Sequence, residues 1–225
     1  MWQDFINMIF PRTCWTCQEI IGTHSLPICT TCQYDLPETN FHLCPTQNPL
    51  TDKFIQTNIR FALAFYYFIK EGRTQRLLHE LKYQNQTEVG ELLGRWYGNL
   101  LRKNDFADKF DLIVPVPLHK KKLKSRGYNQ SDFWAKGLSE ALQIDWKANA
   151  LLKNIETESQ TRKSRIERMD NVSQVFAKNP QIDLKNKHIL LVDDVLTTGA
   201  TLIECANVLL KAEVASVSVA VIAAV

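Results

Sequence analysis

The chain has 225 residues, 45% of them hydrophobic, and a formal net charge of +3 at pH 7. That length and apolar content suit one α/β core with a small accessory module. The charge is too small to diagnose a nucleic-acid-binding protein by itself, and no apolar run is long enough to span a bilayer.

The N-terminal residues, 1–10, have the pattern of a short amphipathic helix, because their apolar side chains fall on one helical face. The segment lacks the basic start of a signal peptide and carries Asp4. We therefore expect a packing helix in a cytoplasmic protein, with contact to a membrane surface as the alternative. The apolar residues are Trp2, Phe5, Ile6, Ile9 and Phe10.

Two C-x-x-C pairs follow, one formed by Cys14 and Cys17 and the other by Cys29 and Cys32. Each pair brings two sulfurs to one metal, and the segment between the pairs is long enough to turn back and complete a tetrahedral Cys₄ zinc site. A redox-active pair is the alternative. Four thiolates leave no open coordination position, so we expect a structural zinc that folds a module too small for its own core. Cys44 is left over, either as a substitute for one ligand or as the remnant of a second site.

Downstream of about Leu50, strand and helix patterns alternate, which is typical of a parallel sheet with helices on both faces. We expect a zinc module with its helix over residues 1–48 and an α/β domain over residues 49–225. The predicted strands span residues 61–69, 111–117, 189–192 and 214–225. One predicted helix ends near residues 82–83, and three others span residues 89–101, 129–142 and 201–211.

A basic loop is predicted after the strand at 111–117. Its cations lie just beyond a strand end, where they can meet several phosphate oxygens, and a solvated surface is the plain alternative. A polar segment at 157–176 has the mixed charge of a surface helix or, beside the other loops, of a mobile lid that closes on substrate. The cations of the loop are Lys120, Lys121, Lys122, Lys124 and Arg126.

The segment after the strand at 189–192 is the most informative in the chain. Asp193 and Asp194 come where the strand is predicted to end, and a Thr/Gly loop then leads into a helix. A helix N-terminus offers free N–H donors and a positive dipole to a phosphate, while acids can accept hydrogen bonds from sugar hydroxyls or hold a hydrated Mg²⁺. A simple helix cap is the alternative. We predict a sugar-phosphate site beyond the carboxyl ends of the strands. Its phosphate-binding residues are Thr197, Thr198, Gly199, Ala200 and Thr201.

This segment resembles the phosphoribosyl pyrophosphate (PRPP) signature of type I phosphoribosyltransferases. The chain contains neither a P-loop motif nor a strand-linked dinucleotide motif. As a whole, the sequence resembles the ComF family of competence-associated, phosphoribosyltransferase-like proteins. The matching features are the C-x-x-C pairs, the Lys82–Tyr83 pair, residues 114–117, the RGYNQ block at 126–130, the segment at 160–176 and the segment at 192–201.

The resemblance implies a type I phosphoribosyltransferase-like parallel sheet flanked by helices, with a small N-terminal zinc-binding module. Asp193 and Asp194 would contact the ribose hydroxyls and the Mg²⁺ of PRPP, and residues 197–201 would hold the 5-phosphate. With Arg168 of the flexible loop at 157–168, the two acids are the catalytic candidates. Candidates for binding the pyrophosphate end are Leu118, His119, Lys120, Lys121, Lys122 and Arg126.

The resemblance also implies a function in natural transformation. A ComF protein, cytoplasmic or peripheral at the inner membrane, assists import of single-stranded DNA beside a helicase-like partner. Two kinds of function stay open: an enzyme that transfers phosphoribose to an unidentified nucleophile, and a binding module that senses PRPP or grips single-stranded DNA. Many family members carry a further C-x-x-C, whereas only Cys44 stands here, which argues against a second metal site.

Overall fold

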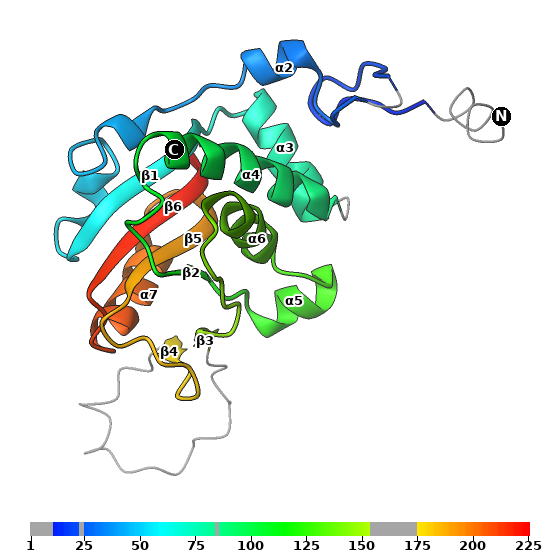
Figure 1. The fold of residues 1–225 in the computed structure, drawn as a ribbon. Helices are drawn as coiled ribbons and strands as arrows, with labels where there is room; N and C mark the ends of the chain where they lie inside the picture. Colours follow the sequence, from blue (N-terminus) through cyan, green and yellow to red (C-terminus); the bar gives the residue numbers. More distant parts are fainter. Residues whose placement is uncertain (1–10, 23–24, 84–85, 154–174) are drawn as a thin grey trace.

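The computed structural model describes residues 11–22, 25–83, 86–153 and 175–225, and its central feature is a four-stranded sheet (Figure 1). The strand order is β1-β6-β5-β2, and every neighbouring pair is parallel. This confirms the predicted parallel sheet. The strands are β1 (Ile59–Tyr67), β2 (Leu112–Pro115), β5 (His188–Leu196) and β6 (Ser216–Ala224).

Helices cover both faces of this sheet, as the alternating pattern predicts. Successive strand residues point to opposite faces, so Leu190 and Val192 pack into one hydrophobic cluster and Ile189 and Leu191 into the other. All four side chains are fully buried, and they form the unbroken apolar run that follows His188 in β5. The first face is covered by α3 (Arg73–Tyr83), α4 (Thr87–Lys103) and α6 (Gln130–Leu142), and the second by α7 (Ala200–Leu210).

Glycines allow α4 and α6 to pack closely. A Cβ on Gly137 of α6 would lie 2.2 Å from the carbonyl oxygen of Glu91, and a Cβ on Gly94 of α4 would lie 2.6 Å from that of Trp134. A larger residue at either position would force the helices apart. This packing fixes α6, and its first residue, Gln130, reaches the acids of β5.

The N-terminal cysteine module packs directly on α3. Arg73 Nη2 lies 2.9 Å from Asp35 Oδ2, and Arg76 Nη1 donates a hydrogen bond to the carbonyl oxygen of Thr16 at 3.1 Å. Cys14, Ile28, Cys32 and Leu36 belong to the same hydrophobic cluster as the buried side chains of α3 and α4. The short elements of this region are α2 (Thr30–Tyr34) and the 3₁₀ helices η1 (Phe41–Leu43) and η2 (Thr51–Phe54).

The predicted basic loop contains a helix, α5 (Lys120–Arg126), which corrects the sequence interpretation. The side chain of His119 accepts a hydrogen bond from the backbone N–H of Lys121 at 3.1 Å and so caps the start of α5. Gly127, with a φ of 85°, ends it in the left-handed conformation that glycine adopts without strain. The cations are therefore held on a short helix.

Strand β5 also differs from its prediction. It continues through the two acids to Leu196, because its ladder with β6 extends to Ala224. An antiparallel ribbon that the sequence analysis did not predict packs beside α7, outside the four-stranded sheet. It is formed by β3 (Leu151–Lys153) and β4 (Phe176–Lys178).

Two predicted features lie outside the described residues. They are the helix at 1–10 and the lid segment up to residue 174, including Arg168. Within the described part of the chain, no helix is long and apolar enough to cross a membrane.

Candidate functional site

The acids of β5 are held by the first turn of α6. Ser131 Oγ donates a hydrogen bond to Asp193 Oδ1 at 2.9 Å, and Gln130 Nε2 donates to Asp194 Oδ2 at 3.1 Å. The backbone N–H of Asp194 also donates to Asp193 Oδ1, at 2.9 Å. The two carboxylates are thus oriented by neighbours within the fold, and they lie inside the strand, whereas the sequence placed them just beyond its end.

A lysine that the sequence analysis did not assign to the site completes this cluster. Lys82 Nζ, from the last turn of α3, lies 3.0 Å from Asp194 Oδ2. The sequence gives two weak signals for Lys82: it belongs to a family motif, and it lies near the end of a predicted amphipathic helix. Neither signal shows that residues 82 and 194 are neighbours.

The acid cluster favours a proton or a cation. Burial, reinforced by the charge of Asp194, raises the pKa of Asp193 to about 7, against the opposing effects of the Asp194 N–H, Ser131 and Lys82. Gln130 Oε1 is buried without a hydrogen-bond partner beside the same carboxylates. Carboxylate and amide oxygens are ligands that Mg²⁺ accepts, and they also accept hydrogen bonds from sugar hydroxyls. The residues present therefore fit the Mg²⁺ of a sugar phosphate.

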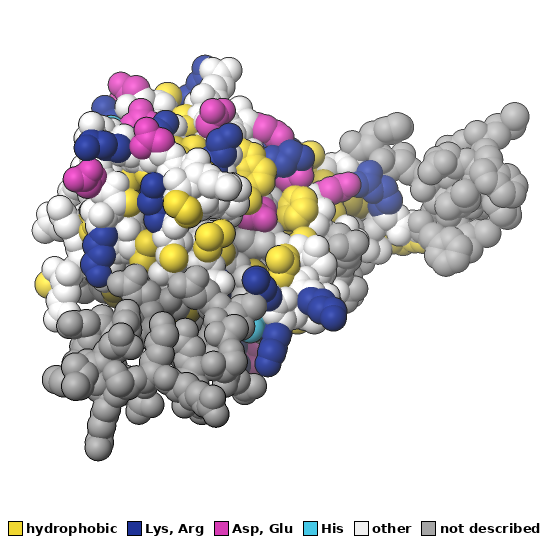
Figure 2. Space-filling model, turned by 90° about the horizontal axis from the view of Figure 1, so that it is seen from below, with side chains coloured by type: hydrophobic (Ala, Val, Ile, Leu, Met, Phe, Trp, Pro, Cys, Tyr) yellow, Lys and Arg dark blue, Asp and Glu magenta, His cyan; other side chains and the backbone are white. Residues whose placement is uncertain are grey.

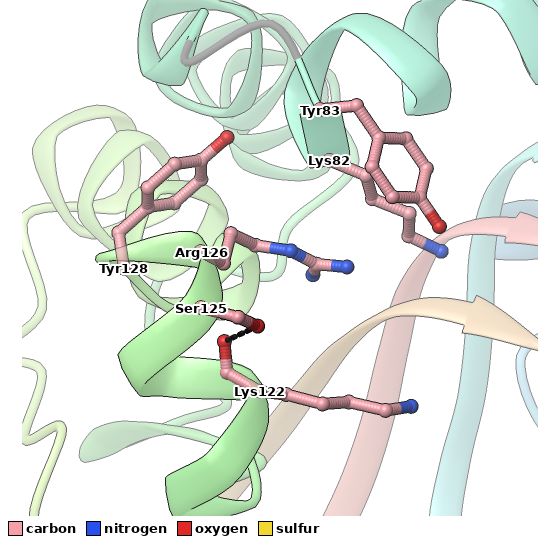
Figure 3. Close-up of a pocket in the computed structure, with 6 residues that line it drawn as sticks. All are labelled: Lys82, Tyr83, Lys122, Ser125, Arg126 and Tyr128. Carbon is pink, nitrogen blue, oxygen red and sulfur yellow. Dashed lines mark hydrogen bonds between the residues drawn. The ribbon is translucent and has the colours of Figure 1, made fainter.

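A cationic pocket adjoins the acids between α3 and α5 (Figure 3). The cavity has a volume of about 400 Å³, and in Figure 3 the charged groups of Lys82, Lys122 and Arg126 extend into the same space. Arg126 Nη1 is buried without a partner, while the guanidinium lies 5.5 Å from the ring centre of Tyr83. Clustered cations of this kind match an anion with several oxygens. The remaining lining residues are Ser125 and Tyr128.

The structure brings together only part of the predicted pyrophosphate-binding set. Lys122 and Arg126 line the pocket, whereas His119 caps α5. The side chains of Lys120 and Lys121 are exposed outside the pocket lining, and Leu118 lies in the segment before α5. The helical form of the basic segment explains the difference, because a helix presents only some of its side chains to one side.

The Thr/Gly loop lies where β5 ends and α7 begins. Gly199 precedes the helix with a φ of 85°, and the backbone N–H of Ala200 donates to Thr198 Oγ1 at 3.4 Å. Lys53 Nζ donates hydrogen bonds to the carbonyl oxygens of Thr197 and Val225, which ties η2 to the loop. Thr201 follows in the first turn of α7. Phosphate binding by the backbone donors at this helix start stays a prediction from the sequence.

The four cysteine sulfurs of the N-terminal module all lie within 4.8 Å of one another, an arrangement that can hold a metal ion. Burial opposes ionisation of Cys14, but backbone N–H groups of Cys17, Cys29 and Thr16 outweigh it and lower its pKa to about 6. A stabilised thiolate is the form that binds zinc. Cys44 is exposed and does not belong to this group. The four residues of the group are Cys14, Cys17, Cys29 and Cys32.

A family model described as a phosphoribosyl transferase domain matches residues 133–225. Competence protein F of Haemophilus influenzae is 30% identical in an alignment of 215 residues, covering 92% of this chain and 87% of that protein. DNA utilization protein YhgH of Escherichia coli K12 is 29% identical over 230 residues, covering 93% and 95%. Among solved structures, glutamine PRPP amidotransferase from B. subtilis gives a TM-score of 0.44 and 20% identity, over 64% of this chain but only 30% of that one.

The parallel sheet, its flanking helices and the domain match define a phosphoribosyltransferase-like protein with the type I fold. The identity to Competence protein F extends over most of both chains. The chain therefore belongs to the ComF family.

Proposed function

We propose that this protein binds PRPP together with Mg²⁺, across the pocket between α3 and α5 and the acids of β5. The observation that carries this proposal is the position of Lys82, which lines the pocket and also pairs with Asp194. Lys82 thus links the anion pocket to the acid pair, and in this proposal one ligand spans both. PRPP requires both parts, because its pyrophosphate needs cations and its ribose hydroxyls and Mg²⁺ need carboxylate oxygens.

Each part of the site has a distinct task in this proposal. Asp193 and Asp194 accept hydrogen bonds from the ribose hydroxyls and hold Mg²⁺, while Lys122 and Arg126 bind the pyrophosphate. The backbone donors of residues 197–201 bind the 5-phosphate. When bound, Mg²⁺ neutralises charge on the pyrophosphate, which makes it a better leaving group.

Binding and turnover are separable functions of such a site. In an enzyme, the bond between the ribose anomeric carbon and pyrophosphate breaks while a nucleophile bonds to that carbon, and positioning with charge stabilisation supplies the catalysis. Arg168, the third catalytic candidate from the sequence, belongs to the segment predicted to act as a lid and lies outside the described residues. In a binding module, the same contacts recognise PRPP without an acceptor. PRPP binding is common to both and is the function that we propose first.

Isothermal titration calorimetry of PRPP with Mg²⁺ tests this proposal in the double variant Asp193→Asn, Asp194→Asn. We expect affinity to fall at least tenfold, because amides cannot supply the negative charge that Mg²⁺ requires. Asp108→Asn is the matched control, since Asp108 is exposed and precedes the start of β2, whereas the acids lie toward the end of the neighbouring parallel strand β5, and it should bind as the wild type does. Unchanged affinity in a double variant with a native circular dichroism spectrum would refute the proposal.

A second function, binding of single-stranded DNA, is favoured by the outer side of α5. Lys120, Lys121 and Lys124 are exposed and do not line the pocket. Seen from below, Lys and Arg side chains gather beside a histidine on the side of the molecule where α5 lies (Figure 2). Such a basic surface suits a DNA backbone. Two relatives are named for competence and for DNA utilization, and these names support the same function. We propose that the protein assists import of single-stranded DNA beside a helicase-like partner. It would act in the cytoplasm or at the inner membrane.

A further inference from the structure

Lys82 contacts two parts of the proposed site. Its Nζ lies 3.0 Å from Asp194 Oδ2, and its side chain also lines the pocket with Lys122 and Arg126 (Figure 3). A lysine ammonium is a point charge on a flexible stem of four carbons. Rotation about the torsions of that stem therefore moves the ammonium from Asp194 toward a ligand in the pocket without displacing α3.

The ion pair limits what else Asp194 can bind. Asp194 is only 9% exposed, and its Oδ2 accepts from Gln130 Nε2 at 3.1 Å while it faces the Lys82 ammonium. A divalent cation that needs this oxygen competes with the lysine, because two positive charges cannot share so small a space without strong repulsion. Asp194 therefore binds a cation well only when Lys82 has another partner.

Two buried polar atoms without hydrogen-bond partners indicate which charges the pocket and the acid pair can accept from a ligand. Arg126 Nη1, in the pocket lining, is a buried donor without an acceptor, and Gln130 Oε1, next to Asp194, is a buried acceptor without a donor. A guanidinium N–H is satisfied by an anion and an amide oxygen by a cation or a hydroxyl. The pocket therefore favours a negatively charged group, and the acid pair favours a positively charged one. Among the described residues, Lys82 is the only lysine that both lines the pocket and pairs with an acid of β5.

We propose that Lys82 is a mobile counter-ion that couples the two halves of the site. A phosphate or pyrophosphate group in the pocket draws the ammonium away from Asp194, and Asp194 then accepts a divalent cation. This inference rests on the proposed function, since PRPP brings both the anionic group and its Mg²⁺. By thermodynamic reciprocity, the cation raises the affinity for the anion by the same factor.

The coupling is measured by binding, with Mn²⁺ and inorganic phosphate as probes and the full chain as the protein. Free Mn²⁺ is followed by electron paramagnetic resonance in two titrations, one without phosphate and one with saturating phosphate. A protein-free series with the same phosphate corrects for association of the two ions in solution. We expect phosphate to tighten Mn²⁺ binding by about tenfold, within the usual range for coupled sites. Equal Mn²⁺ affinity in both titrations would overturn the inference.

Two substitutions at this position separate a mobile counter-ion from a static ion pair. Lys82→Met keeps most of the stem but removes the charge, so Mn²⁺ should bind tightly without phosphate and should no longer respond to it. Lys82→Arg restores a cation and should restore part of the response. Lys185→Met removes an exposed lysine that pairs with Glu213 near the start of β5, at the opposite end of the strand from the acids, and it should couple as the wild type does. If Lys82→Met instead weakens Mn²⁺ binding, the lysine only supports the fold and the inference is wrong.

The outcomes distinguish this inference from the proposed function. If Lys82→Met does not fold, the wild-type titrations and Lys82→Arg still decide the matter. A wild type that binds PRPP but shows no coupling between phosphate and Mn²⁺ contradicts only the counter-ion. A wild type that shows the coupling but does not bind PRPP contradicts the proposed function instead.

Discussion

At the scale of single residues, Asn129 joins the end of β2 to the first turn of α6. Its Nδ2 donates hydrogen bonds to the carbonyl oxygen of Val116 at 3.0 Å and to Asp132 Oδ1 at 2.8 Å. Burial raises the pKa of Asp132 to about 6, although the Asn129 hydrogen bond opposes the shift. The folded protein therefore holds this proton over a pH range in which the unfolded chain has lost it. The contribution to stability is greatest below about pH 4 and disappears as the pH rises through about 6.

Asp132→Asn tests this linkage, because an amide resembles the protonated carboxyl and does not titrate. We expect the unfolding free energy of the variant, relative to that of the wild type, to be higher at pH 8 than at pH 5. Urea denaturation at pH 5, 6, 7 and 8 measures the difference, and effects of pH on the cysteine module cancel because both proteins carry it. A difference independent of pH would contradict the raised pKa.

Residue-level signals in the sequence predict one half of the acid cluster. Asp193 and Asp194 are recognisable because paired acids after an apolar run, followed by a Thr/Gly loop, form a local pattern. Lys82, Gln130 and Ser131 are not assigned to the site from the sequence, since their contacts with the acids connect residues far apart in the chain. Such partners become visible only when α3, α6 and β5 are placed together.

At the scale of elements, α5 shows why a helix can be interpreted as a loop. Two prolines end the preceding strand, and the following lysines lack an apolar stripe, so no helical periodicity is visible. The terminal signals are nevertheless present, because His119 caps the start and Gly127 ends the helix. Likewise, the predicted β5 is too short, since acids usually mark a strand end, whereas here the ladder with β6 extends the strand.

The two sides of α5 should have separable functions. Lys122→Gln with Arg126→Gln should weaken binding of PRPP and pyrophosphate, because both side chains line the pocket. The matched triple variant Lys120→Gln, Lys121→Gln, Lys124→Gln should keep PRPP affinity but bind single-stranded DNA more weakly. Its slope of log affinity against log salt should fall by about 2, at roughly 0.7 for each DNA phosphate that the variant no longer neutralises.

Parallel titrations of both variants with PRPP and with an oligonucleotide, at several salt concentrations, measure these effects. Competition between free pyrophosphate and PRPP in the wild type provides an independent check on the pocket. A pocket variant that retains full PRPP affinity but loses DNA binding would move the protein into the class of DNA-binding modules.

At the scale of the whole molecule, the cysteine module and the sheet share their hydrophobic packing. Cys14, Ile28, Cys32 and Leu36 belong to the same buried cluster as the side chains of α3 and α4. The sequence predicts a module over residues 1–48 that metal alone folds, beside a domain over 49–225. The packing adds that a loss of metal should also loosen the N-terminal part of α3, since Arg73 and Arg76 bind the module.

Metal analysis tests this arrangement. We expect about one zinc per chain, bound by four thiolates, and loss of that zinc in Cys17→Ser. Hydrogen exchange in Cys17→Ser should increase over the described residues up to 45 and in the first turns of α3, while β5 and β6 stay protected. Cys44→Ser is the matched control: its exposed thiol lies outside the cluster, so zinc content should not change. Absence of metal from the wild type would contradict the zinc assignment.

The contacts at the two ends of α3 constrain the length of this helix. Arg73 and Arg76 fix its first turns to the cysteine module, and Lys82 in its last turn meets Asp194. One residue more or fewer between them would turn Lys82 by about 100° around the helix axis and shift it by about 1.5 Å along that axis. The contacts at both ends could not then form together. The spacing between Arg73 and Lys82 is therefore as much a part of the site as the lysine itself, and insertions are tolerated only outside this helix.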